Sequence, residues 1–230
     1  MSRRSILRFG GWLLLVLAVT ALAYPRAAKE VVEIPLLVKV FDYTSVQSWR
    51  LHRAEGIADR ILIRGVGRVV WLDCPVDMNG RQVDPRCASQ GPLTLEISIY
   101  ADGPTPGPRH DVLGYVTTSG SSPHRATIYY RRIQEQAAAG CGLEEEILGP
   151  VLAHEIGHLL LGPVLGFEYH SADGVMRAHL SPVEFHLASV ARLRFKPGEA
   201  AALRNEMDRR TRVYSAALLA TVATRVGEPL

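Results

Sequence analysis

Two histidines and a glutamate lie within one five-residue segment, His154-Glu155-Ile156-Gly157-His158. Residues four apart in a helix lie on the same face, so His154 and His158 can direct their imidazoles at one metal ion. Glu155 lies beside them, where it can accept a proton from a water that the metal activates. The apolar residues around the segment are typical of a buried helix. The pattern therefore predicts a catalytic zinc site with His154 and His158 as ligands and Glu155 as general base.

The third ligand is sought downstream, because catalytic zinc usually has three protein ligands and one open position. Glycines and a proline after Gly162 allow the chain to reverse toward the metal, and we predict His170 as the ligand that it delivers. Glu168, Asp173 and His179 are the nearby alternatives.

The elements that must position this segment follow from the periodicity of the apolar residues. The order is a strand, a helix and several further strands. We predict strands at Val31–Tyr43, Val69–Leu72 (short and buried), Leu93–Tyr100, Val112–Thr118 (at a sheet edge) and Ala126–Ile133, and a helix at Ser48–Ile63.

Proline and glycine set the predicted limits of the histidine helix. We expect it to begin near Gly149-Pro150, after a helical turn or bent segment at Leu143–Leu148, and to end at Gly162-Pro163, which makes roughly three turns. Pro197–Arg210 is predicted as an amphipathic helix, and Val213–Leu230 as a marginal helix or a frayed tail.

The N-terminus has the pattern of a secretory signal peptide. Arg3, Arg4 and Arg8 precede the uncharged stretch Trp12–Ala23, which ends in a small-x-small cleavage site before Tyr24. We predict residues 1–23 as a signal peptide, with an uncleaved N-terminal anchor as the alternative, and a secreted or periplasmic protein. Without the three arginines the chain has as many basic as acidic residues, 23 of each, which gives no reason to expect a nucleic-acid partner.

The three cysteines, Cys74, Cys87 and Cys141, are interpreted in the same oxidising context. A disulfide between Cys74 and Cys87 would close a loop rich in Pro, Gly, Asp and Asn, which has little apolar surface to bury. Pairing of Cys141 with either of the others stays open. The chain has no CxxC pair, which argues against a zinc site made of cysteines.

Residues 151–177 resemble the metzincin clan of zinc peptidases, and look like a bacterial branch of it. In that clan a helix with HExxH turns at a glycine toward a third histidine, and a methionine turn follows beneath the zinc. Here Gly162, His170 and Met176 would take these three places. The spacing departs from the family pattern, because Gly162 lies four residues after His158 and His170 twelve, instead of three and six.

The resemblance implies an α+β fold. Its expected parts are a twisted mixed sheet with an antiparallel edge strand, helices packed on the sheet, the active-site helix at a cleft and a small C-terminal subdomain. It implies a peptidase domain at residues 31–212, divided into 31–162 and 163–212, and a tail at 213–230. The implied activity is that of an exported zinc endopeptidase, in which the edge strand near Val112–Thr118 binds an extended peptide or protein substrate.

Two other interpretations stay open. In a gluzincin-type peptidase the third ligand would be a glutamate on a later helix, for which Glu184 is the candidate. In a non-catalytic exported binding module the zinc would only stabilise the fold, but such a site has no use for the carboxylate of Glu155. The sequence gives no reason to expect a stable membrane association beyond the signal peptide or an N-terminal anchor.

Overall fold

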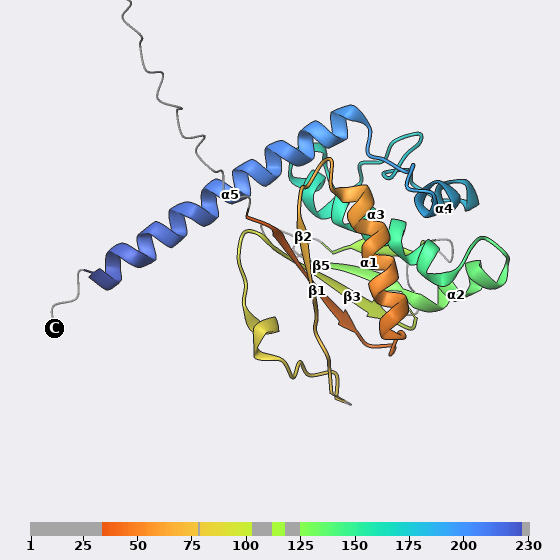
Figure 1. The fold of residues 1–230 in the computed structure, drawn as a ribbon, viewed down its shortest axis with the longest axis horizontal. Helices are drawn as coiled ribbons and strands as arrows, with labels where there is room; N and C mark the ends of the chain where they lie inside the picture. Colours follow the sequence, from red (N-terminus) through yellow and green to blue (C-terminus); the bar gives the residue numbers. More distant parts are fainter. Residues whose placement is uncertain (1–33, 78, 103–111, 118–124, 227–230) are drawn as a thin grey trace, which may run out of the picture. The chain divides into compact units, whose positions relative to one another are not determined.

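A strand, a helix and several further strands follow one another along the first half of the chain, as the periodicity predicts. A computed structural model describes residues 34–77, 79–102, 112–117 and 125–226, which belong to one compact unit, Glu33–Leu230 (Figure 1). The predicted signal peptide, residues 1–23, lies outside the described residues. The elements are β1 (Leu36–Asp42), α1 (Ser48–Leu62), β2 (Val69–Asp73), the 3-10 helix η1 (Pro85–Ala88), β3 (Thr94–Tyr100), β4 (Gly114–Val116), β5 (Arg125–Tyr129), α2 (Tyr130–Ala138), α3 (Glu144–Leu165), α4 (Pro182–Ser189) and α5 (Pro197–Val226).

Five strands form one mixed sheet in the order β2-β1-β3-β5-β4. β1 pairs in parallel with β2 and β3, and β3 pairs in parallel with β5. β4 is antiparallel to β5 and lies at the edge, so the predicted mixed sheet with an antiparallel edge strand is confirmed. The prediction of a buried strand at Val69–Leu72 is wrong in its burial. β2 is the other edge strand, and its Val70 is 36% exposed because an edge strand has a neighbour on one side only.

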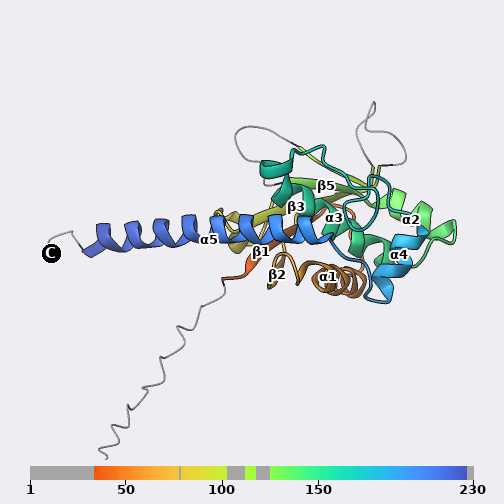
Figure 2. The same ribbon diagram turned by 90° about the horizontal axis from the view of Figure 1, so that it is seen from above.

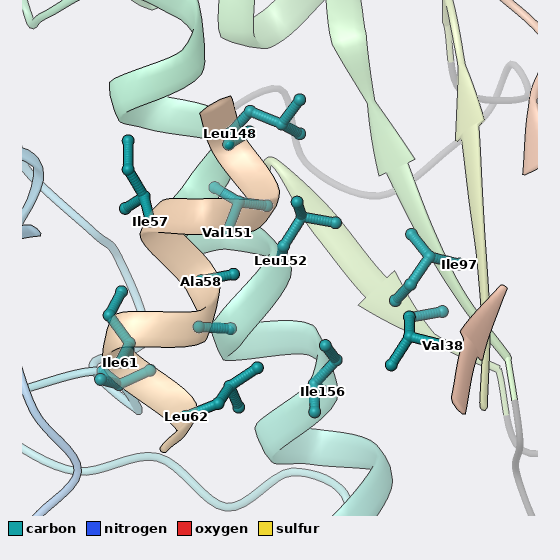
Figure 3. Packing of buried hydrophobic residues seen from close by; sticks show 14 of the residues in the cluster. Val38, Ile57, Ala58, Ile61, Leu62, Ile97, Leu148, Val151, Leu152 and Ile156 are labelled. Carbon is teal, nitrogen blue, oxygen red and sulfur yellow. The ribbon is translucent and has the colours of Figure 1, made fainter. Parts of the chain in front are cut away.

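Alternate residues of the central strands form the core beneath α1 and α3. Val38 of β1 and Ile97 of β3 are fully buried and point toward the two helices, from which Leu62 and Ile156 extend to meet them (Figure 3). Full burial of such a side chain stabilises the fold by roughly 1.5–3 kcal/mol. The sheet thus supports the helix that carries the histidine motif.

The predicted limits of the histidine helix are wrong. α3 is one continuous helix of 22 residues, Glu144–Leu165, with Pro150 and Pro163 inside it. Each proline removes a backbone hydrogen bond, but the helix is held by packing, because its residues from Ile147 to Gly162 are buried. α3 is also long and apolar enough to cross a membrane, yet 89% of its most apolar stretch is buried inside the protein, as in a core helix.

A side chain from α5 compensates for one of these prolines. Pro163 cannot donate to the carbonyl four residues before it, that of Leu159. The guanidinium of Arg210 is buried and reaches this carbonyl, with Nη2 3.4 Å from the oxygen, while its Nε donates to Glu206 at 2.8 Å. A proline that would otherwise end the helix is therefore accommodated by a distant segment.

The strand predicted at Ala126–Ile133 is also wrong at its end. β5 ends at Tyr129, and α2 begins at Tyr130. Both tyrosines are buried, and Ile133 is buried on the inner side of α2, so the apolar residues fit a helix as well as a strand.

The opposite face of the sheet is covered by the loop that the disulfide closes. Cys74 and Cys87 are bonded, as predicted, and Cys141 is free. Phe41 packs against the two buried sulfurs. Lys39, on the same face of β1, is fully buried and donates to the backbone carbonyls of Cys87, at 2.9 Å, and of Ser89.

α5 continues beyond the predicted Pro197–Arg210 to Val226 as one helix. In both views its C-terminal half extends away from the other elements (Figures 1 and 2). Its residues Val213, Leu218 and Leu219 are exposed accordingly.

Candidate metal centre

The two histidines of the motif lie one turn apart on α3. Nε2 of His158 is 3.0 Å from Nε2 of His154, and both side chains are buried. At a tetrahedral zinc ion with bonds near 2.0–2.1 Å, ligand nitrogens lie about 3.4 Å apart. The two imidazoles are therefore positioned as ligands of a single ion would be.

His170 faces them from the segment that follows α3. Its ring centroid is 5.5 Å from that of His154 and 4.8 Å from that of His158. One ring nitrogen of each histidine lies within 4.8 Å of the other two. Nδ1 of His170 lies 3.1 Å from the carbonyl oxygen of Glu168, and a proton donated there leaves Nε2 as the nitrogen with a lone pair. The structure thus brings together the three histidines that the sequence predicts as ligands.

The turn that returns the chain to His170 lies later than predicted. Gly162 is helical. The helix ends at Leu165 and is followed by Gly166, whose φ of 92° belongs to the left-handed region that glycine adopts without strain. Gly162 has a different role. Phe167 folds back over it, and a Cβ at this position would collide with the Phe167 ring. The later turn explains why His170 lies twelve residues after His158.

The segment around Met176 contacts the histidine helix at two points. Nδ1 of His154 donates to the carbonyl oxygen of Val175 at 2.7 Å, which fixes the ring and leaves Nε2 with its lone pair toward His158. Met176 is fully buried and packs against Gly157, between the two histidines, where a Cβ would collide with its sulfur. Met176 therefore packs against the turn of α3 that carries both histidines.

Burial favours the neutral form of two of the histidines. It lowers the pKa of His154 to about 4, although the hydrogen bond to Val175 acts in the opposite direction. It lowers the pKa of His158 to about 3, with a further contribution from the neighbouring rings of His154 and His170. Both imidazoles can therefore offer a lone pair at neutral pH without first losing a proton.

Glu155 is buried beside them and only 2% exposed. Its Oε2 has no hydrogen-bond partner within the described residues, and burial raises the pKa of its carboxyl to about 8. Gly114 of β4 is what makes room for this carboxylate, since a Cβ on Gly114 would lie 2.6 Å from Oε1 of Glu155. The sequence analysis missed Gly114, although a glycine within a strand often indicates a close approach by another group.

A pocket of about 390 Å³ opens onto these side chains. The edge strand β4 lies along it, as predicted for the strand near Val112–Thr118, of which Thr118 lies outside the described residues. Tyr115 of β4 stacks on Tyr129 with ring centroids 5.7 Å apart. The pocket is lined by Val112, Leu113, Gly114, Tyr115, Val116, Gln136, Val151, His154, Glu155, His158, Phe167, Glu168, His170, Ala178, His179 and Leu180.

The alternative ligands have other environments. Glu168 and His179 line the same pocket, whereas Asp173 forms an ion pair with Lys196 at 2.9 Å. Glu184 caps α4 and is engaged at both oxygens. Its Oε1 accepts from Arg177 at 2.8 Å, and its Oε2 accepts from the amide of Ser181 at 2.9 Å. Burial opposes ionisation of Glu184, but these hydrogen bonds outweigh it and hold its pKa below the usual value.

Comparison with known proteins gives one structural likeness. No protein-family model matches the chain, and a search of curated proteins finds no significantly similar sequence. Among solved structures, archaemetzincin from Methanopyrus kandleri is similar at a TM-score of 0.48 and 17% sequence identity, over 76% of this chain and 96% of that one. A likeness at this level carries no argument about activity, so the chemistry of the site rests on the geometry described above.

Proposed function

We propose that this protein is an exported zinc-dependent endopeptidase. The observation that carries the proposal is the convergence of three imidazoles, those of His154, His158 and His170, on one point beside a buried carboxylate in an open pocket. Three neutral nitrogen ligands with one position left for water are what catalytic zinc uses. A site that only stabilises the fold closes with a fourth protein ligand and gains nothing from the unpaired oxygen of Glu155.

The chemistry divides between the ion and the chain. When bound, zinc polarises a carbonyl group and makes water acidic enough to react near neutral pH. Glu155 accepts the proton of the attacking water and passes it to the leaving amine. Its buried position favours this role, because Oε2 has no hydrogen-bond partner within the described residues and is free to take that proton. The hydrogen bond from His154 to Val175 keeps the first ligand in the tautomer that this reaction needs.

The pocket indicates an extended peptide as substrate. β4 is a short edge strand that lies along the pocket, and a peptide can add to such an edge through backbone hydrogen bonds. Such bonds would hold the scissile peptide group across the face of the site, next to His154 and Glu155. We therefore propose peptides or proteins as the substrates.

The proposed location is outside the cytoplasm, secreted or periplasmic, with an N-terminal anchor as the alternative to cleavage before Tyr24. The disulfide between Cys74 and Cys87 supports this, because such bonds persist in oxidising compartments and are rare in the cytosol.

The test measures bound zinc and hydrolysis of a peptide mixture on the same purified protein. We expect Glu155→Gln to keep zinc and to lose activity by a factor of roughly 10²–10⁴, the usual contribution of a general acid-base group. We expect His154→Ala to lose both, and His170→Ala to bind zinc more weakly. His186→Ala, an exposed histidine on α4, is the matched control.

Three results would contradict the proposal in different ways. Full activity in Glu155→Gln would show that Glu155 is not the general base. Unchanged zinc affinity in His170→Ala would show that the third ligand is a neighbour such as Glu168 or His179. Tight zinc binding with no hydrolysis of any peptide would favour a binding module.

A further inference from the structure

A second cluster of ligating side chains lies between α1 and β2, outside the pocket of the histidine motif. His52 and Glu55 are three residues apart on α1 and share one face, and Asp73 is the last residue of β2. One ligand atom from each of the three lies within 4.8 Å of the other two. Nε2 of His52 is 3.2 Å from Oδ2 of Asp73, close to the separation of about 3.4 Å between neighbouring ligands on a tetrahedral ion.

A surface pair of His52 and Asp73 would need no further explanation, but Glu55 is different. It is only 6% exposed, and its Oε1 is buried without a hydrogen-bond partner within the described residues. The charged neighbours that act on it, Asp73 and Asp59, are themselves acidic, and Asp73 also acts on it through a side-chain hydrogen bond. Burial of an unpaired carboxylate oxygen next to other acids is unfavourable, and either a proton or a metal cation can compensate for it.

We propose that His52, Glu55 and Asp73 bind a divalent transition-metal ion at a second site. One imidazole and two carboxylates form a mixed nitrogen and oxygen donor set, which suits zinc, cobalt and manganese better than calcium or magnesium. His52 and Asp73 are exposed, so the ion enters from solvent, and water completes its coordination.

Such an ion would join α1 to the edge strand β2. α1 also packs against the histidine helix α3, where Ile57 lies so close to Gly149 that a Cβ there would be 2.6 Å from that of Ile57. The second site would therefore stabilise the helix pair that carries the first site, without touching the pocket. We expect it to raise the melting temperature and to leave the hydrolysis rate unchanged.

The experiment counts metal ions on the full chain with cobalt and zinc as probes. In a His154→Ala/His158→Ala variant, which removes the proposed catalytic site, we expect one ion per chain to remain. Adding His52→Ala or Asp73→Asn should lower the affinity for this remaining ion at least tenfold. It should also abolish the shift in melting temperature that zinc produces. His186→Ala and Asp208→Asn, exposed residues on α4 and α5, are the matched controls.

The outcomes separate the two proposals. If wild type and the His52→Ala and Asp73→Asn variants bind the same number of ions with the same affinity, the second site is refuted, whatever the first site does. If the ion is lost in His52→Ala but not in His154→Ala/His158→Ala, the second site stands and the catalytic one fails. Because His52 and Asp73 are exposed, we expect both variants to fold, and circular dichroism verifies this. Glu55→Gln is a third variant that should show the same loss.

Discussion

Replacement of Gly114 by alanine tests whether the position of Glu155 against the edge strand matters for catalysis. The new Cβ would lie 2.6 Å from Oε1 of Glu155 and 2.9 Å from the carbonyl oxygen of Thr127. Carbon and oxygen atoms in close contact normally stay about 3.3–3.6 Å apart. The carboxylate or β4 must therefore move by roughly 0.7 Å, and the Thr127 carbonyl cannot yield easily because it belongs to the paired strand β5.

The expected consequence is a loss of activity with little change at the metal. A displacement near 1 Å in a catalytic group can reduce the rate about a hundredfold, which is about 2.7 kcal/mol of transition-state stabilisation. The atoms nearest to the new Cβ belong to Glu155 and Thr127, so zinc affinity should stay within about threefold. Added volume in this packed site should also lower the free energy of unfolding by about 1–3 kcal/mol.

The assay compares kcat/KM, zinc affinity and urea unfolding for Gly114→Ala and for Gly198→Ala. Gly198, near the start of α5, has open space where its Cβ would lie and is the control. A double variant of Gly114→Ala with Glu155→Asp adds a coupling test, because a shorter side chain withdraws from the new methyl group. The loss of kcat/KM in the double variant, expressed as a free energy, should be smaller than the sum of the losses in the two single variants. Wild-type activity and stability in Gly114→Ala would refute the argument.

Three further predictions concern stability. In the presence of a chelator, Glu55→Gln should become increasingly stabilising relative to wild type from pH 4.5 to 8. Burial raises the folded-state pKa of Glu55 to about 8, so folding favours the protonated carboxyl. The contribution of Glu55 to the free energy of unfolding is therefore fully present below pH 4.5 and is lost as pH rises through 8. The change should amount to a few kcal/mol in urea unfolding. Replacement of Cys74 and Cys87 by serine should lower the free energy of unfolding by about 3 kcal/mol and abolish its dependence on reductant. Arg210→Met should cost about 3 kcal/mol in thermal or urea unfolding, because it leaves the buried Glu206 carboxylate without one of its partners and a carbonyl of α3 without a donor; an unchanged stability would contradict the role assigned to Arg210.

Periodicity predicted the elements whose apolar residues lie on a single face. The helix at Ser48–Ile63 and the strand at Leu93–Tyr100 are confirmed nearly to the residue, because the apolar residues of each repeat on one face, although the polar face of β3 is buried as well. The segment at Ala126–Ile133 is apolar on more than one side. A short run of this kind fits both a strand and a helix, and only the packing of Ile133 in the folded chain decides for α2.

The limits of the histidine helix could not be predicted, because they depend on residues far away in the sequence. Pro163 normally ends a helix, but Arg210 replaces the hydrogen bond that it removes. The additional turn moves the reversal of the chain to Gly166 and so sets the distance along the sequence at which His170 returns. The unusual spacing between His158 and His170 is therefore a consequence of the longer helix.

The same reasoning explains why the types of the candidate site residues were predictable and their environment was not. The spacing of His154, Glu155 and His158 on one helix identifies them from the sequence. Gly114 matters only because β4, paired with β5, places it against Glu155. Burial raises the pKa of Glu155, and Gly114 of β4 leaves the space that its carboxylate occupies. A motif on an exposed helix would have the same ligands but a solvated carboxylate with an ordinary pKa. The edge strand and its glycine thus belong to the proposed catalytic machinery as much as the motif does.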